Sequence, residues 1–263
     1  MNKMERCLII FDIDETLYMN SECRIPESAL VAIEKLKEAG HMLAIATGRA
    51  PFEIMDEIRR LPIDFYILAN GQLVMQDNEV IYENAIEFDI INEIMMDADA
   101  AGVYVGFNSA ARTFLTGMTD EMREVFASYQ LPMPTISRQL EKDESIHQIR
   151  WYFSNDYMNI TEKFKDRIRF IPWLRSPGAD ILPIGVSKAF ALVKMSEALD
   201  VKMPEKVVFF GDGANDVELI EAADVGVAMG NAVESLKDIA DFVTKNIDDD
   251  GIYYACEKLG LLG

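Results

Sequence analysis

The sequence is poor in the residues that most often bind transition metals. Its 263 residues include only two histidines, His41 and His147, and three cysteines, Cys7, Cys23 and Cys256. Neither histidine lies near another candidate metal ligand, and the cysteines form no CxxC pair, so neither a zinc site nor a histidine-based catalytic triad is expected. The wide cysteine spacing predicts free thiols in a reducing compartment.

Basic residues are also scarce. The chain has 25 Lys and Arg against 45 Asp and Glu, which gives a formal net charge of −20. Such a surface repels nucleic acid and anionic membranes, so neither is expected as a partner. An anionic substrate would therefore need local positive charge from a metal ion, a lysine or backbone N–H groups.

Long hydrophobic runs are absent as well. No stretch approaches the ~20 apolar residues of a membrane span. The apolar run 7–11 is too short to form the core of a signal peptide. We therefore expect a cytoplasmic protein. A monomer or weak homodimer is expected as well.

The first seventy residues alternate between short buried strands and helices. Apolar runs at 7–11, 42–46 and 65–69 predict strands, and the patterns at 26–39 and 51–60 predict the helices between them. This β-α-β-α-β order favours a parallel sheet with right-handed crossovers.

A second domain is predicted to interrupt this pattern. After a hairpin at 73–75 and 80–82, the pattern between 85 and 181 changes to a mixture of helices and strands. The parallel pattern then resumes, with Ser187 capping a helix. The sequence thus predicts an α/β fold, with a Rossmann-like parallel-sheet core (1–84 and 182–263) and an inserted α+β cap domain (85–181).

Polar clusters follow three of the predicted buried strands. They are Asp12-Ile13-Asp14, Thr47-Gly48-Arg49 and the run from Asp212 to Asp216. Each cluster alone is typical of a turn or a helix cap. In an open parallel sheet, however, the carboxyl ends of the strands line one crevice where ligands bind. Carboxylates brought together there need a cation, and oxygen ligands suit Mg²⁺.

The order of these clusters resembles the haloacid dehalogenase superfamily of phosphatases, in its Cof-like type with a large (C2B) cap. The resemblance rests on four motifs in order, 12–16, 47–49, Lys188 and 211–216, and on two further stretches, 226–232 and 249–252. Four motifs at these separations are far more specific than one. Glu15 and Ala189 stand where this family often has glycine, and Glu15 leaves the substrate range less defined.

The resemblance implies a role for each motif. Asp12 would attack phosphorus to form an aspartyl-phosphate, and Asp14 would act as general acid and then general base. The implied Mg²⁺ ligands are Asp12, Asp14 (through its backbone carbonyl), Asp212 and Asp216. The implied phosphate-binding residues are Thr47, Gly48, Lys188 and Asn215.

The insert is expected to contact the leaving group of the substrate. An arginine there would bind a second anionic group, and a tryptophan would stack on a ring. The candidates by residue type are Arg49, Asn108, Arg112, Arg150, Trp151, Trp173, Arg175 and Ser176. The resemblance implies a small phosphorylated metabolite, a sugar phosphate or phosphorylated cofactor, and the residues do not choose between these.

Three alternatives to a phosphatase stay open at this stage. A phosphomutase would use the same aspartate pair and return the phosphate to its substrate. A dehalogenase is disfavoured, because Asp14 would have no evident task in halide displacement, and because Lys188 and the metal ligands favour phosphate. A non-catalytic metabolite-binding module is disfavoured by the intact set of Asp12, Asp14, Lys188 and Asp212.

Overall fold

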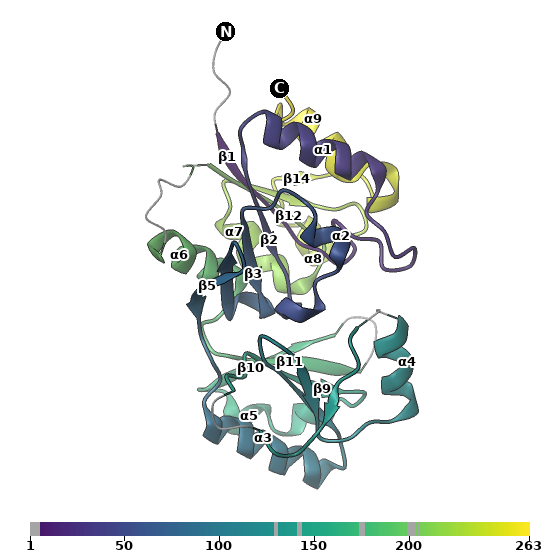
Figure 1. Ribbon diagram of the computed structural model, residues 1–263, viewed down its shortest axis with the longest axis vertical. Helices are drawn as coiled ribbons and strands as arrows, with labels where there is room; N and C mark the ends of the chain where they lie inside the picture. The colour runs from purple at the N-terminus through teal and green to yellow at the C-terminus, as the bar shows by residue number, and fades with distance from the viewer. Residues whose placement is uncertain (1–5, 129–130, 141–143, 174–176, 199–203, 205) are drawn as a thin grey trace. The chain divides into compact units, whose positions relative to one another are not determined.

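The computed structural model describes residues 6–128, 131–140, 144–173, 177–198, 204 and 206–263, and the chain divides into two compact units (Figure 1). The first, the core unit, contains Met1–Gly48, Met55–Tyr82 and Ser187–Gly263. The second, the insert unit, contains Arg49–Ile54 and Glu83–Val186.

An eight-stranded sheet forms the centre of the core unit, in the order β14-β13-β12-β1-β2-β3-β4-β5. The pairings from β14 through β3 are parallel, and β4 runs antiparallel to β3. The strands are β1 (Cys7–Phe11), β2 (Met42–Ala46), β3 (Phe65–Leu68), β4 (Leu73–Gln76), β5 (Glu79–Glu83), β12 (Lys206–Gly211), β13 (Val225–Ala228) and β14 (Phe242–Val243). The predicted α/β fold class is confirmed.

Continuous apolar runs explain why the central strands are found so readily from the sequence. Every residue of β1 and of β2 is buried, as expected for a parallel sheet covered on both faces. Helix α1 packs against α9, and α6 packs against α7. The helices of this unit are α1 (Glu27–Glu38), α2 (Asp56–Arg59), α6 (Lys188–Ala198), α7 (Val217–Ala222), α8 (Glu234–Lys237) and α9 (Gly251–Lys258).

The single helix predicted over 51–60 is wrong. The segment instead forms a 3₁₀ turn at Pro51–Glu53, extended backbone at Ile54 and Met55, and the short helix α2. The carboxylate of Glu53 accepts a hydrogen bond from the Ala50 N–H at 2.8 Å, which closes the turn on itself. This local side-chain bond competes with continuation of a helix.

The insert unit is built on a six-stranded sheet in the order β10-β11-β9-β6-β7-β8. All its pairings are antiparallel except that of β7 with β8. The strands are β6 (Val105–Asn108), β7 (Thr113–Leu115), β8 (Thr135–Ile136), β9 (Gln148–Tyr152), β10 (Ile168–Pro172) and β11 (Gly178–Pro183). The helices are α3 (Phe88–Ala101), α4 (Asp120–Ser128) and α5 (Thr161–Phe164).

Strand β11 was not predicted from the sequence. It begins at Gly178 and ends at Pro183. Glycine and proline usually indicate turns, so the sequence gives little sign of a strand here. The domain boundary expected between residues 181 and 182 falls inside this strand. The insert unit instead extends from Glu83 to Val186 and also takes in Arg49–Ile54.

The two faces of the insert sheet differ in chemistry. Ile149 and Trp151 of β9 point into an apolar cluster that includes Ile94 of α3. Because side chains alternate along a strand, Gln148 and Arg150 lie on the other face. Polar partners from neighbouring strands join them there, so this part of the second face is polar, whereas a smaller apolar cluster around Tyr152 covers another part of it.

The two histidines make hydrogen bonds within the protein, and the three cysteines form no disulfide. His41 is buried, where its Nδ1 accepts a hydrogen bond from the Cys7 N–H and its Nε2 bonds the carbonyl of Leu261, each at 3.0 Å. His147 contacts Glu83 through Nε2 at 2.7 Å. All three cysteines are free thiols. Within the described part of the chain, no helix has the combination of length and apolar character that a membrane crossing needs.

Gly71 allows the turn after β3 to pass close to the start of α6, which gives a first prediction. It has φ +100°, and a Cβ there would lie 2.1 Å from the Ser187 carbonyl oxygen, whereas a Cβ at Gly40 (φ +89°) would meet nothing within 4 Å. Gly40→Ala should lower the free energy of unfolding by about 1 kcal/mol through backbone strain alone. Gly71→Ala should lower the free energy of unfolding by roughly 1–3 kcal/mol more than Gly40→Ala does, because the backbone at Ser187 must move to make room for the Cβ.

Urea denaturation of the two variants measures this difference. Equal losses at the two glycines would contradict the close approach between Gly71 and Ser187.

Candidate active site

Three carboxylates meet at the carboxyl end of the parallel strands in the core unit. Asp12 follows β1, and Asp212 follows β12, whose register pairs Phe11 with Phe210. Asp216 joins them from the 3₁₀ turn Ala214–Asp216. Carboxylate oxygens of Asp12, Asp212 and Asp216 all lie within 4.8 Å of one another. The structure therefore brings together residues about 200 positions apart in the sequence, as the sheet order requires.

Lys188 lies at the centre of this cluster. Its Nζ donates hydrogen bonds to Asp12 Oδ1 at 2.8 Å and to Asp216 Oδ1 at 2.6 Å. The side chain is 1% exposed. Lys188 is the first residue of α6, and the preceding Ser187 accepts the Phe190 N–H through its hydroxyl at 3.1 Å, so the predicted helix cap is confirmed. This cap fixes the point where Lys188 enters the site.

Asp216 is held by donors on both of its oxygens. While Oδ1 accepts from Lys188, Oδ2 accepts from the backbone N–H groups of Asp212 at 3.0 Å and Gly213 at 2.9 Å. Gly211 makes room for it, because a Cβ there would lie 2.7 Å from the Asp216 carboxylate. Asp216 therefore orients both Lys188 and the loop that carries Asp212.

The electrostatics of the cluster show an excess of negative charge. Burial raises the pKa of Asp12 well above its ordinary value; Lys188 opposes this rise, while Asp216, Asp212 and Asp14 add to it. Burial, with the charge of Asp216, raises the pKa of Asp212 to about 7. Burial alone would lower the pKa of Lys188, but Asp12 and Asp216 outweigh it and raise that pKa. Lys188 is therefore charged at neutral pH.

The donor set fits a divalent cation. Three close carboxylates face one ammonium group, and their surplus charge adds to the effect of burial in raising the pKa values of Asp12 and Asp212. A hard divalent ion would remove the surplus, and carboxylate oxygens are the ligands that Mg²⁺ prefers. Because both Asp216 oxygens already accept protein donors, Asp12 and Asp212 are the side chains better suited to direct coordination.

Thr47, Gly48 and Asn215 lie close to Asn70, which follows β3. Asn70 N–H bonds the Thr47 carbonyl at 3.0 Å, and its side-chain oxygen accepts from Asn215 Nδ2 at 2.9 Å. A Cβ at Gly48 would lie 3.1 Å from the Asn70 amide. Asn70 is buried with φ 54°. It therefore positions Asn215 beside the Thr47-Gly48 turn.

Thr16 is a further residue that the sequence reasoning left without a role. Its hydroxyl donates to Asp212 Oδ1 at 3.1 Å, and the side chain is fully buried. The signal was its place in the first motif, four residues after Asp12. Thr16 orients the Asp212 carboxylate and, by donating to it, lowers the pKa of Asp212 against the effect of burial.

The candidates within the insert unit have protein partners. Arg150 pairs with Glu53, and the Trp173 indole N–H donates to Asp180 at 3.0 Å. Arg49 is buried and donates to the Glu53 carbonyl at 3.2 Å. Each residue is held in place by these contacts.

Of the other candidates in the insert, two bond to neighbouring side chains and one is fully buried. Arg112 donates to both oxygens of Glu144 and lies 4.5 Å from the Phe114 ring centroid. Asn108 donates to Gln148 at 2.9 Å. Trp151 has no exposed surface and packs in the apolar cluster, so its expected contact with substrate is wrong. Arg175 and Ser176 lie outside the described residues.

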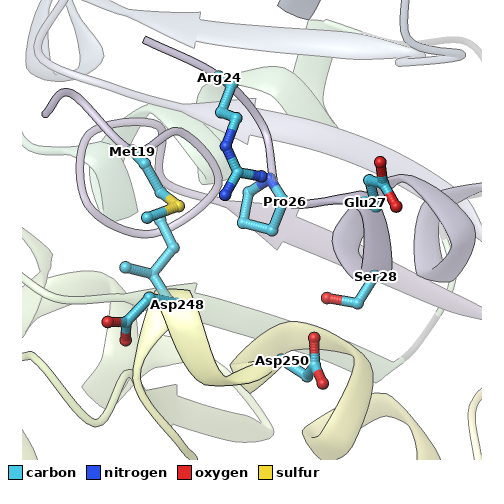
Figure 2. A pocket seen from close by; sticks show the side chains of 8 residues that line it. Met19, Arg24, Pro26, Glu27, Ser28, Asp248 and Asp250 are labelled. Atoms are coloured by element: carbon cyan, nitrogen blue, oxygen red, sulfur yellow. The ribbon is translucent and has the colours of Figure 1, made fainter. Parts of the chain in front are cut away.

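A separate pocket in the core unit contains none of the candidate site residues (Figure 2). It has a volume of about 450 Å³. Its lining mixes acidic, basic and apolar side chains: Met19, Arg24, Pro26, Glu27, Ser28, Ile247, Asp248 and Asp250. The mixture favours no single class of ligand.

The fold and the Asp12-centred site define a hydrolase of the haloacid dehalogenase type, and comparison with known proteins agrees. The family model described as haloacid dehalogenase-like hydrolase matches residues 9–256. The chain is 36% identical to "Putative phosphatase YkrA" of Bacillus subtilis (strain 168), covering 98% of this chain and all of that one. It is 26% identical to the 5-amino-6-(5-phospho-D-ribitylamino)uracil phosphatase YitU of the same organism, covering 93% and 94% of the two chains.

Solved structures give the same result. The HAD subclass IIB sugar phosphatase BT4131 matches with a TM-score of 0.87 and 28% identity, covering 97% of this chain and 99% of that one. A hypothetical protein of Geobacillus kaustophilus HTA426 matches with a TM-score of 0.85 and 32% identity, covering 97% and 99%. The chain belongs to the haloacid dehalogenase-like hydrolase family. The predicted family and the predicted enzyme class, a phosphatase, are confirmed.

The raised pKa of Asp212 predicts how stability depends on pH without metal. The folded protein keeps this proton up to pH about 7, whereas an unfolded aspartate releases it near pH 3.9. Because the folded state then binds more protons, this contribution to stability is lost as pH rises from about 4 to about 7. Asp212→Asn should remove that loss.

Urea unfolding of both proteins in chelator, at about pH 5 and about pH 8, measures this contribution. Mg²⁺ should stabilise the wild type more at the higher pH, because it competes with the proton for the carboxylate. Identical pH profiles for wild type and Asp212→Asn would contradict the assignment.

Proposed function

We propose that this phosphatase hydrolyses small phosphorylated metabolites through an aspartyl-phosphate on Asp12, with Mg²⁺ as cofactor. One observation carries the proposal: a buried lysine bridges Asp12 and Asp216 where Asp212 also converges. A carboxylate that is buried, bonded to a fixed ammonium and next to a cation-binding group is placed to attack phosphorus. The small substrates of the named relatives support the substrate class.

Two side chains would share the chemical steps. Asp12 would attack the phosphorus atom with one carboxylate oxygen, forming an acyl phosphate as the bond to the leaving oxygen breaks. Asp14, close enough to raise the pKa of Asp12, would give a proton to that leaving oxygen. The same carboxylate would then take a proton from the water that hydrolyses the acyl phosphate, which returns both residues to their starting states.

The phosphoryl group would be held by donors of the core unit. Lys188 would supply positive charge to the equatorial oxygens while keeping its contact with Asp216. Thr47, the Gly48 backbone and Asn215, which Asn70 orients, would supply hydrogen bonds. Asp12, Asp212 and the Asp14 carbonyl would hold Mg²⁺, with Asp216 in support, and the ion would neutralise charge on the phosphate. These donors answer the need for local positive charge in an acidic protein.

The alternatives are separated by products. A phosphomutase would need a bisphosphorylated activator and would return an isomer of its substrate. A metabolite-binding module would bind the phosphate ester and release it unchanged. Release of inorganic phosphate in Mg²⁺, without an activator, distinguishes the phosphatase from both.

Asp12→Asn should lower turnover by about 10³-fold or more, because the amide is a poor nucleophile. Asp248→Asn is the matched control, since Asp248 is exposed and lies in the separate pocket. Turnover is measured as phosphate release from a panel of phosphorylated metabolites and p-nitrophenyl phosphate, with circular dichroism to verify folding. Wild-type turnover in a folded Asp12→Asn protein would disprove the nucleophile assignment.

A further inference from the structure

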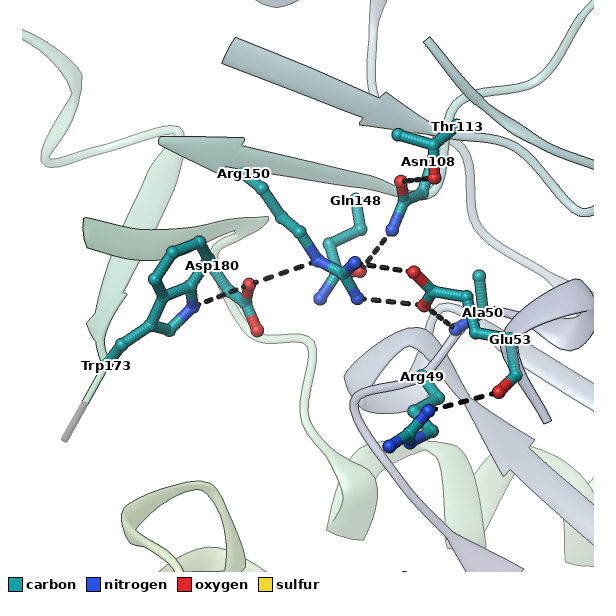
Figure 3. Close-up of polar contacts among 9 residues, drawn as sticks. All are labelled: Arg49, Ala50, Glu53, Asn108, Thr113, Gln148, Arg150, Trp173 and Asp180. Atoms are coloured by element: carbon teal, nitrogen blue, oxygen red, sulfur yellow. Dashed lines mark hydrogen bonds and ion pairs between the residues drawn. The ribbon is translucent and has the colours of Figure 1, made fainter. Parts of the chain in front are cut away.

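A buried ion pair fixes the short segment Arg49–Ile54 within the insert unit (Figure 3). Arg150 of β9 donates from its two terminal nitrogens to the two oxygens of Glu53, at 2.6 and 2.9 Å. The Glu53 side chain is fully buried, and that of Arg150 is 12% exposed. A bidentate pair at this depth is stronger and more directional than a surface pair.

Both members of the pair are themselves held. Glu53 Oε2 also accepts the Ala50 N–H at 2.8 Å. On the other side, Arg150 Nε lies 3.7 Å from Asp180, and Asp180 accepts the Trp173 indole N–H at 3.0 Å. Figure 3 shows this chain of contacts running from the Ala50 turn to the insert sheet. The geometry of the Glu53–Arg150 pair is therefore fixed from both ends.

These contacts bear on whether Arg150 binds the substrate, as its residue type suggested. Its two terminal nitrogens are engaged by Glu53, and Asp180 supplies a second negative charge nearby. A guanidinium binds a phosphate most strongly through two parallel N–H groups, and this edge of Arg150 is already occupied. Arg150 is therefore better suited to position the protein than to bind a second anionic group of the substrate.

The position of the segment in the chain gives the pair its importance. Arg49 follows Gly48 directly, so the segment is covalently continuous with the Thr47-Gly48 turn of the core unit. The chain passes between the two units at four peptide bonds, after Gly48, Ile54, Tyr82 and Val186. The first two belong to a segment that the ion pair joins to β9.

We infer that the Glu53–Arg150 pair is a positioning element that ties the segment after the Thr47-Gly48 turn to the insert sheet, and so fixes that turn for phosphate binding. The effect on catalysis rests on the proposed function of the turn. The link between the segment Arg49–Ile54 and β9, here called the tether, does not depend on that function and can be measured without substrate.

Amide hydrogen exchange of Arg49–Ile54 in the full-length protein tests the tether. Arg150→Met, Glu53→Gln and the double variant are compared with Arg138→Met. The control removes an equally bidentate pair with Asp99 in the same unit, at 2.7 and 2.8 Å, that does not involve the segment. Arg150→Met alone leaves the buried carboxylate of Glu53 without its cation, which is itself destabilising. The double variant has no such carboxylate, so it reports the loss of the pair alone. Exchange of the Ala50 amide should accelerate about tenfold or more in all three tether variants and stay unchanged in the control.

Kinetics with p-nitrophenyl phosphate test the consequence. Glu53→Gln and Arg150→Met should each lower kcat about tenfold with little change in KM, because the phosphate-binding turn is less well fixed. The double variant should be no worse than the single variants, since all three remove one interaction.

Three results would overturn the inference. These are unchanged exchange in the tether variants, an equal loss of kcat in Arg138→Met, or a rise in KM confined to Arg150→Met, which would make Arg150 a substrate contact. If the wild type released phosphate from no ester, the proposed function would fail, while the exchange result would still decide whether the tether exists.

Discussion

The hydrogen bonds from Lys188 to Asp12 and Asp216 are the interactions on which the site depends. Two buried carboxylates this close would repel each other, and each would lose its hydration. One ammonium group between them opposes this repulsion, and its two hydrogen bonds set the spacing of the carboxylates. Removing it would leave two uncompensated charges in the interior, a change that typically costs about 3–5 kcal/mol when one partner of a buried pair is lost.

The parallel sheet makes this arrangement possible. Buried strands β1 and β12 end side by side, and α6 begins where Ser187 caps it, so three chain segments deliver Asp12, Asp212 and Lys188 to one place. The same geometry resolves the difficulty posed by a net charge of −20. One lysine and backbone N–H groups lie at the strand ends, and a divalent ion bound by the three carboxylates would supply the further positive charge that a phosphate needs, while the surface stays acidic.

Much of this was predictable because each signal was local. Continuous apolar runs identify β1 and β2, and the resemblance of the motifs to the haloacid dehalogenase superfamily points to Asp12, Lys188 and the loop after β12. The failures involve contacts between distant segments. Nothing near Glu53 indicates that it is buried against Arg150 on β9, and residue type alone could not show that Trp151 faces the apolar side of its strand. The sequence likewise could not show that both oxygens of Asp216 accept hydrogen bonds, because the donors come from distant parts of the chain and from the loop geometry.

The most direct test of the account is to locate the phosphoryl group during turnover. The wild-type protein with Mg²⁺ and p-nitrophenyl phosphate is quenched in acid, digested, and mapped by mass spectrometry. An acid-stable, base-labile phosphoryl group is expected on the peptide that contains Asp12, since acyl phosphates are hydrolysed rapidly in base. A phosphoryl group on another residue, or continued turnover with Asp12 never modified, would contradict it.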